Sequence, residues 1–262
     1  MPKSINKVVV FDLDDTMGHF EELSIFLGGL KNIVNKKITD KYIFKLLDLW
    51  PKFLRFGLIE ILELIETYKK RDHSIKVVIY TNNTGPRSWT MIIKQYLEKK
   101  INYKLFDKII TAYRNNEKTN KRTTHNKTHA DLLKATKYSK DSQFIFLDDQ
   151  YHPDMIHKNI NYIKLHPYDY GIPFHVMIEQ YLHSSYGKII KKEDWDDFRK
   201  YMLQYLSSGK GIYKYNIKRN EITKKDIQEF KRIKRSVREL INTKKTRHHR
   251  KSGNKKTRKI YE

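Results

Sequence analysis

Short runs of apolar residues alternate with longer amphipathic stretches over the first two thirds of the chain. The runs are rich in β-branched and aromatic residues, as buried strands are, and they lie at residues 7–11, 76–80, 106–112, 143–147 and 161–165. Between them, apolar positions recur at helical spacing at residues 54–70, 89–97 and about 128–137. This alternation predicts right-handed βαβ units, so we expect an α/β fold with a doubly wound, Rossmann-like parallel sheet.

The pattern becomes purely helical after Phe174. Apolar residues at 195–206 and 227–241 are spaced for two helices, and Thr223 is placed to cap the second. Beyond residue 242, nine Lys and Arg residues against one Glu leave a net charge of about +8 and almost nothing to bury. We therefore expect a core over residues 1–173, a helical extension over 174–242 and a basic, disordered tail over 243–262.

The formal charge of the whole chain is +24, and a field of that sign attracts polyanions such as nucleic acid, acidic protein tails or anionic lipid. Heavy use of Lys, Ile, Asn and Tyr, as in an AT-rich coding sequence, can explain the diffuse excess but not the clustered tail. Three roles stay open for that tail. It could bind nucleic acid or another polyanion, serve as a nuclear localisation signal, or stay solvated without a fixed partner.

The sequence contains no cysteine, so any metal must be held by oxygen or imidazole ligands. It shows neither a signal peptide pattern nor an apolar stretch of about 18 residues that would span a membrane. We expect a soluble intracellular protein, cytoplasmic or nuclear, that does not associate with membranes.

Acidic and hydroxyl residues follow three of the expected strands. Asp12 and Asp14 come directly after the first strand, Thr81 follows the second, and Asp148 and Asp149 follow the fourth. Ligands of parallel sheets bind beyond the carboxyl ends of the strands, so these side chains are expected to gather there. Acids next to a buried strand are costly unless they bind a cation or catalyse, although an acidic helix-capping turn is the alternative explanation.

A lysine completes this set. Lys127 directly precedes a predicted helix and lies 21 residues before Asp148, which leaves room for a helix and a strand, so we prefer it to its rival Lys121. Phosphoryl transfer needs a nucleophile, an acid–base group, groups that hold the phosphoryl oxygens, and a metal held by carboxylates. His152, His157 and His166 match no compact imidazole site, and we assign them no role.

In this order the motifs resemble those of the haloacid dehalogenase superfamily of aspartate-nucleophile phosphatases, over roughly residues 7–165. The resemblance implies that Asp12 is the nucleophile that forms an aspartyl-phosphate. It also implies that Asp14 protonates the leaving group and then activates water. Thr81, Asn82 and Lys127 would bind the phosphoryl group of the substrate.

The same resemblance implies a magnesium ion as cofactor. Its ligands would be the carboxylates of Asp12 and Asp148, the backbone carbonyl of Asp14 and, directly or through water, Asp149. These are the hard oxygen ligands that Mg²⁺ prefers.

Within the superfamily, the chain is most similar to the nearly capless phosphatases that act on the RNA polymerase II C-terminal domain, also called NLI-interacting-factor-like phosphatases. It departs from them in having Asp15 where they carry glutamate, and Arg55-Phe56-Gly57 where they carry arginine, proline and glycine. The pair Thr81-Asn82 instead resembles phosphatases of polynucleotide ends or small phosphate esters. The AT-rich bias and the basic tail are similar to versions encoded by large DNA viruses, which would act in the host cell.

Three functions follow. About 37 residues separate Thr16 from Leu54, which suits a minimal cap and an open site for a large substrate. The first hypothesis is a magnesium-dependent phosphatase of a phosphorylated macromolecule such as a phosphoprotein. The second is a nucleic-acid 3′-end phosphatase, which the charge, the tail and Thr81-Asn82 favour. The third is a catalytically silent basic binding protein, against which the complete set of motifs argues.

Overall fold

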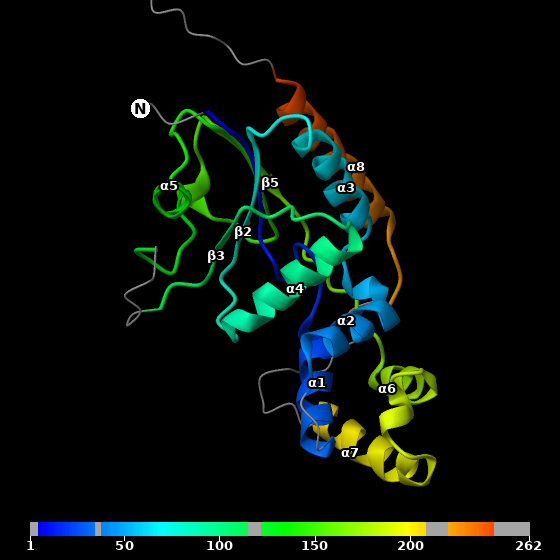
Figure 1. The fold of residues 1–262 in the computed structure, drawn as a ribbon. Coiled ribbons are helices and arrows are strands. Elements are labelled where there is room, and N and C mark those ends of the chain that lie inside the picture. Colours follow the sequence, from blue (N-terminus) through cyan, green and yellow to red (C-terminus); the bar gives the residue numbers. More distant parts are fainter. Residues whose placement is uncertain (1–4, 35–37, 115–121, 208–219, 244–262) are drawn as a thin grey trace, which may run out of the picture.

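The computed structural model describes residues 5–34, 38–114, 122–207 and 220–243, and the expected basic tail from residue 244 onward lies outside them (Figure 1). Five strands form one all-parallel sheet in the order β3-β2-β1-β4-β5, which confirms the α/β class. The strands are β1 (Lys7–Phe11), β2 (Ile75–Tyr80), β3 (Lys108–Ile110), β4 (Gln143–Asp148) and β5 (Ile160–Lys164).

Eight α-helices accompany the sheet in the described part of the chain. They are α1 (Glu21–Ile33), α2 (Asp40–Leu49), α3 (Leu58–Lys69), α4 (Arg87–Lys100), α5 (His129–Thr136), α6 (Phe174–His183), α7 (Trp195–Ser207) and α8 (Lys224–Asn242). Short 3₁₀ helices are η1 (Pro51–Phe53), η2 (Pro153–Met155), η3 (Gly187–Ile189) and η4 (Lys192–Asp194). The connection from β1 to β2 holds α1, α2 and α3, whereas β4 and β5 are joined through η2 alone.

The two faces of the sheet are covered unequally. Successive strand residues point to opposite faces, so Val9 and Phe11 enter one core cluster and Val8 and Val10 enter another. The larger cluster includes buried residues of α3, α4 and α8 and continues into α1, α2, α6 and α7. In the smaller cluster, buried helical residues come from α5 and from Met155 of η2.

Helices α1, α2, α6 and α7 form a second layer beside the end of the sheet where β1 stops, in the lower part of Figure 1. α7 packs against both α1 and α6. The ring of Phe26 in α1 lies 5.0 Å from Trp50 and 5.2 Å from Tyr181 of α6, between ring centroids. Trp50 Nε1 also donates a hydrogen bond to Gln180 Oε1 at 2.9 Å. The residues between β1 and α3 supply only α1 and α2 of this layer. Helices α6 and α7 from the later part of the chain complete it.

The last described helix, α8, returns to the sheet and packs against α3, β1 and β4. Thr223 caps it as the sequence predicts, because its hydroxyl accepts a hydrogen bond from Asp226 N and the Asp226 carboxylate accepts one from Thr223 N. Gly57 fixes the approach of α8 to α3: its φ of 74° lies in the left-handed region, and a Cβ there would be 2.2 Å from the ring of Phe230. The C-terminal helices thus lie in two places: α6 and α7 are part of the helical layer, and α8 packs against the sheet.

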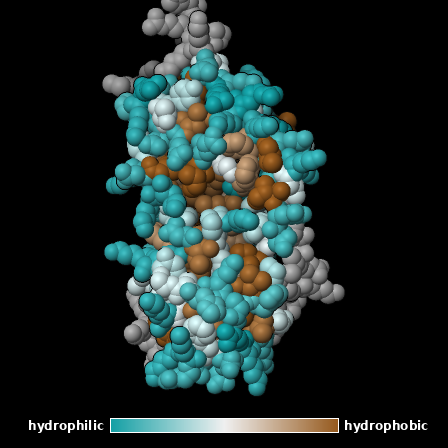
Figure 2. Space-filling view, turned by 90° about the vertical axis from the view of Figure 1, so that its right-hand side faces the viewer, coloured by the Kyte–Doolittle hydropathy of each residue, from teal (hydrophilic) through white to brown (hydrophobic). Residues whose placement is uncertain are grey.

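Figure 2 shows the face on the right-hand side of Figure 1. Hydrophilic side chains cover most of it, and apolar side chains gather around a hollow near its centre. In the described residues, no helix combines the length and the apolar character needed to cross a membrane.

Candidate functional site

Asp12 and Asp148 meet because their strands are neighbours. β1 and β4 are neighbours in the sheet, and the chain runs from β1 to β2 on one side and from β4 to β5 on the other. A point where the strand order reverses in this way opens a crevice beyond the strand ends. The register pairs Phe11 with Leu147, and the backbone N–H of Asp12 donates to Leu147 O at 2.9 Å. The carboxyl ends of β1 and β4 therefore present these two acids side by side.

Lys127 lies between the two carboxylates. Its Nζ is 2.5 Å from Asp12 Oδ1 and 2.6 Å from Asp148 Oδ2, and its side chain is almost completely buried. The next residue, Thr128, caps α5 by accepting a hydrogen bond from Asp131 N, and its own N–H donates to the hydroxyl of Tyr80. The start of α5 is thereby fixed to β2, which holds Lys127 at the strand ends. Its rival Lys121 lies outside the described residues.

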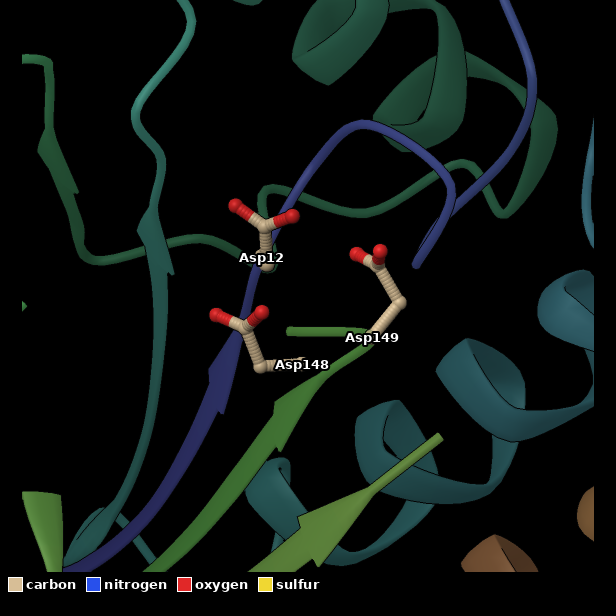
Figure 3. A group of neighbouring side chains, drawn as sticks. All are labelled: Asp12, Asp148 and Asp149. Carbon is tan, nitrogen blue, oxygen red and sulfur yellow. The ribbon is translucent and has the colours of Figure 1, made fainter. Parts of the chain in front are cut away.

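Asp12, Asp148 and Asp149 form a buried carboxylate group with one oxygen each within 4.8 Å of the others (Figure 3). Asp149 is oriented by Thr16, whose hydroxyl donates to Asp149 Oδ1 at 3.1 Å and accepts from Asp149 N at 3.0 Å. We call the three acids and Lys127 the cavity cluster. Its donor set of carboxylate oxygens is one that can hold a hard divalent cation.

The cavity cluster has three acids and one lysine, and the pKa values of the three acids are shifted from their usual range. Burial raises the pKa of Asp12 to about 7, against the attraction of Lys127. Burial together with the charges of Asp148 and Asp15 raises the pKa of Asp149 to about 6. For Asp148 burial acts in the same direction, but contacts with His152 and Lys127 outweigh it and hold its pKa below the usual range.

Asp14 and Thr81 share one hydrogen-bonding partner, Asn83. Asn83 Nδ2 donates to Asp14 Oδ2 at 2.8 Å, and Asn83 N donates to the hydroxyl oxygen of Thr81 at 3.0 Å. Burial raises the pKa of Asp14, although the bond from Asn83 opposes this. The carboxylate of Asp14 is not part of the group that gathers Asp12, Asp148 and Asp149.

Asn82 is exposed and contacts an arginine that the sequence analysis did not identify. Arg122 Nη1 donates to Asn82 Oδ1 at 2.7 Å, and Arg122 Nη2 donates to His125 O at 2.6 Å. The arginine is buried and lies over the ring of Tyr80. It therefore ties the loop after β2 to the segment that leads to Lys127.

All these strand-end residues line one cavity of about 680 Å³. The acids and Lys127 line one part of its wall, and Phe20, residues of α1 and the start of α4 line a second part. That second part is partly apolar and includes Phe20 and Trp89, whose rings meet edge to face at 6.4 Å between centroids. The cavity is large enough for a phosphate group together with an aromatic group next to it.

Arg55 fixes the loop after β1 through hydrogen bonds to its backbone carbonyls. Its guanidinium donates to the carbonyls of Asp15 and Thr16 at 2.6 Å each, to His166 O at 2.7 Å and to Glu229 Oε2 of α8 at 2.9 Å. Asp15 needs such support because its φ of 51° is one that few non-glycine residues adopt. We call Arg55, Glu229 and these three carbonyls the loop clamp. In the sequence, Arg55 could be noticed as the basic residue before Gly57. Its partner Glu229, 174 positions away, could not.

Two histidines also belong to this region. His19 Nδ1 lies 2.7 Å from Asp15 Oδ1 and its Nε2 lies 3.0 Å from Glu22 Oε2. Burial acts to lower the pKa of His19, but these two acids outweigh it and raise that pKa to about 10, so the ring is charged at neutral pH. His152, to which the sequence analysis assigned no role, places Nε2 3.3 Å from Asp148 Oδ2.

His157 and His166 lie away from the cavity lining. In comparisons with known proteins, no protein-family model, no curated protein and no solved structure matches this chain.

Proposed function

We propose that the protein is a magnesium-dependent phosphatase that attacks phosphate monoesters with the carboxylate of Asp12. One observation carries this proposal. Lys127 is buried between Asp12 and Asp148 in the wall of a cavity of about 680 Å³, with Asp149 close by. A nucleophilic acid, a cation for the phosphoryl oxygens and further acids for a metal are the parts that this reaction needs.

The residues present fit a magnesium ion. Three buried carboxylates share one ammonium, and such an excess of negative charge is costly unless another cation neutralises it. Asp12, Asp148 and Asp149 would supply oxygen ligands, as Mg²⁺ prefers. When bound, the ion would neutralise negative charge on the phosphoryl oxygens.

Four protein groups have separate roles in the two steps of the reaction. Lys127 and the hydroxyl of Thr81 hold the phosphoryl oxygens, while an oxygen of Asp12 attacks phosphorus and the bond to the leaving oxygen breaks. Asp14 gives its proton to that leaving oxygen. In the second half, Asp14 removes a proton from water, and the water oxygen attacks the phosphorus of the aspartyl-phosphate. Inorganic phosphate leaves and Asp12 is regenerated as a carboxylate.

The order of these residues along the chain supports assignment to the haloacid dehalogenase superfamily, with a doubly wound sheet of that type. Within it we propose a macromolecular substrate such as a phosphoprotein. A nucleic-acid 3′ end is the second candidate, which a specific feature favours: Trp89, whose ring packs against the buried Phe20, gives the cavity a partly exposed aromatic side chain that suits a nucleobase, on a chain with a charge of +24.

The test measures phosphate release from p-nitrophenyl phosphate, a phosphotyrosine peptide and a 3′-phosphorylated oligonucleotide, each with and without Mg²⁺. We expect turnover only with the metal, and a loss of about 10³-fold or more in kcat for Asp12→Asn. Asp141→Asn is the matched control, because it makes the same chemical change at an exposed site and should leave kcat unchanged.

Absence of magnesium-dependent turnover by the wild type on all three substrates would leave the silent binding protein as the better hypothesis. Activity that persists in Asp12→Asn would refute the nucleophile. A higher kcat/KM on the oligonucleotide than on the peptide would select the second candidate substrate.

A further inference from the structure

The outward side of α8 carries a row of cations. Six Lys and Arg side chains are exposed along it, which we call the α8 stripe: Lys224, Lys225, Lys231, Arg232, Arg235 and Arg238. At a rise of about 1.5 Å per residue, the stripe extends over roughly 21 Å of helix. Its spacing keeps all six on the solvent-facing side of α8, from which Arg232 Nη1 also reaches the end of β5 and donates to Lys164 O at 3.3 Å.

The acids of the same helix are directed elsewhere. Asp226 is buried in the capping interaction with Thr223, and Glu229 is buried in the loop clamp. Glu239 is the one exposed acid within α8. None of the six cations forms an ion pair with an acid in the described residues, whereas their neighbour Lys234 contacts Glu60. The stripe is therefore an uncompensated positive surface, not one half of an internal salt-bridge network.

We infer that the α8 stripe binds the phosphate backbone of nucleic acid. Its length of roughly 21 Å matches about six phosphates along one strand of a duplex, at about 3.4 Å of axis each. Interfaces with nucleic acid are polar and strongly positive, and the contacts to phosphate carry most of the affinity. The stripe has this composition.

A protein partner fits the stripe less well. Stable protein interfaces need buried aromatic or aliphatic anchors at their centre. The one large apolar side chain exposed on α8 is Ile227, and it is only 37% exposed. The stripe thus offers charge without an anchor.

A membrane surface fits even less. A helix that lies on a bilayer inserts an apolar face into it. The apolar residues Ile233, Val237 and Ile241 are buried against the protein core, and Phe230 is packed over Gly57. No apolar face of α8 is left for lipid.

Binding of nucleic acid by the α8 stripe does not depend on catalysis. Its test uses the full chain and a fluorescein-labelled duplex DNA of 20 base pairs of mixed sequence, with anisotropy measured between about 50 and 200 mM salt. The variant is the triple change Lys231→Glu, Arg235→Glu and Arg238→Glu. The matched control reverses three exposed lysines near the opposite face of the sheet: Lys134→Glu, Lys140→Glu and Lys158→Glu.

Both triple variants change the net charge equally, so a difference between them reports position alone. For the stripe variant, we expect Kd at 0.15 M salt to rise roughly 100-fold and the slope of log Kd against log salt to fall by about 3. In the control, Kd and the salt slope should change only as much as the loss of net charge alone causes. Thermal unfolding of both variants checks that each is folded.

Equal losses in the two variants would overturn the inference, because binding would then depend on net charge and not on α8. So would a 20-residue poly-glutamate peptide that binds the wild type as tightly as the DNA does and loses affinity in the stripe variant. Turnover of p-nitrophenyl phosphate serves as a separate measurement and should be the same in the stripe variant and the wild type.

Discussion

The loop after β1 is held by two buried charged groups that differ in balance. In the cavity cluster, three carboxylates face one ammonium, and the group borders a cavity of about 680 Å³. In the loop clamp, one guanidinium meets one carboxylate and three backbone carbonyls. A satisfied group of this second kind stabilises the fold, whereas the unbalanced one retains free energy that a ligand can recover. The difference predicts opposite effects of substitution on stability.

The largest effect is expected in the loop clamp. Arg55→Met keeps much of the side-chain volume but leaves the carboxylate of Glu229 buried without its cationic partner, so unfolding should cost about 3–5 kcal/mol less. Urea denaturation at pH 7 measures this. Arg71→Met, at an exposed position, is the control and should change stability by less than about 0.5 kcal/mol. A loss below about 1 kcal/mol for Arg55→Met would mean that the clamp is not the support that its contacts indicate.

A smaller effect, dependent on pH, is expected at His19. Its pKa is raised to about 10, so the stability it adds is fully present below its unfolded pKa of 6.5 and is lost as pH rises through 10. Between pH 7 and 9 the wild type should therefore lose about 2 kcal/mol more than His19→Asn. Urea denaturation of both proteins across this range tests it. Parallel curves would show that His19 is not held as the cation between Asp15 and Glu22.

The smallest effect is expected in the cavity cluster and has the opposite sign. The pKa of Asp149 is raised to about 6, so its ionisation destabilises the fold progressively as pH rises from about 4 through 6. The rise of this pKa from 3.8 to about 6 corresponds to at most about 3 kcal/mol, and the weaker hydrogen bond from Thr16 to a neutral amide offsets part of it. Asp149→Asn, in the presence of EDTA at pH 8, should therefore be more stable than the wild type by about 1 kcal/mol. Mg²⁺ should raise the melting temperature of the wild type more than that of the variant. A variant less stable than the wild type in EDTA would show that the cluster is balanced without a metal.

Much of the sheet could be predicted from the sequence because parallel strands buried on both faces are short apolar runs. The runs at 7–11 and 143–147 correspond to β1 and β4, whereas the third strand is shorter than expected, over Lys108–Ile110. The meeting of Asp12 and Asp148 was also predictable, since carboxyl ends of parallel strands share one edge. The position of Lys127 near these acids was predictable because Lys127 lies just before the helix that leads to β4.

The supporting residues were not predictable in the same way. Arg55 contacts Glu229 across 174 positions, and no periodicity or local motif links them. The packing of α6 and α7 on α1 depends on the match of side chains such as Phe26 and Tyr181, which a pattern of apolar positions does not specify. Asn83 contacts Asp14 and Thr81, and His152 contacts Asp148, only because of how the loops are placed in space.

The distance along the chain between Arg55 and Glu229 also has a consequence for biosynthesis. At about 5–20 residues per second, a ribosome needs roughly 9–35 s to add the residues between them. Until α8 leaves the exit tunnel, the carbonyls of Asp15 and Thr16 lack the anchored guanidinium that fixes their loop. The nascent chain therefore carries all the acids of the cavity cluster before the loop after β1 is clamped.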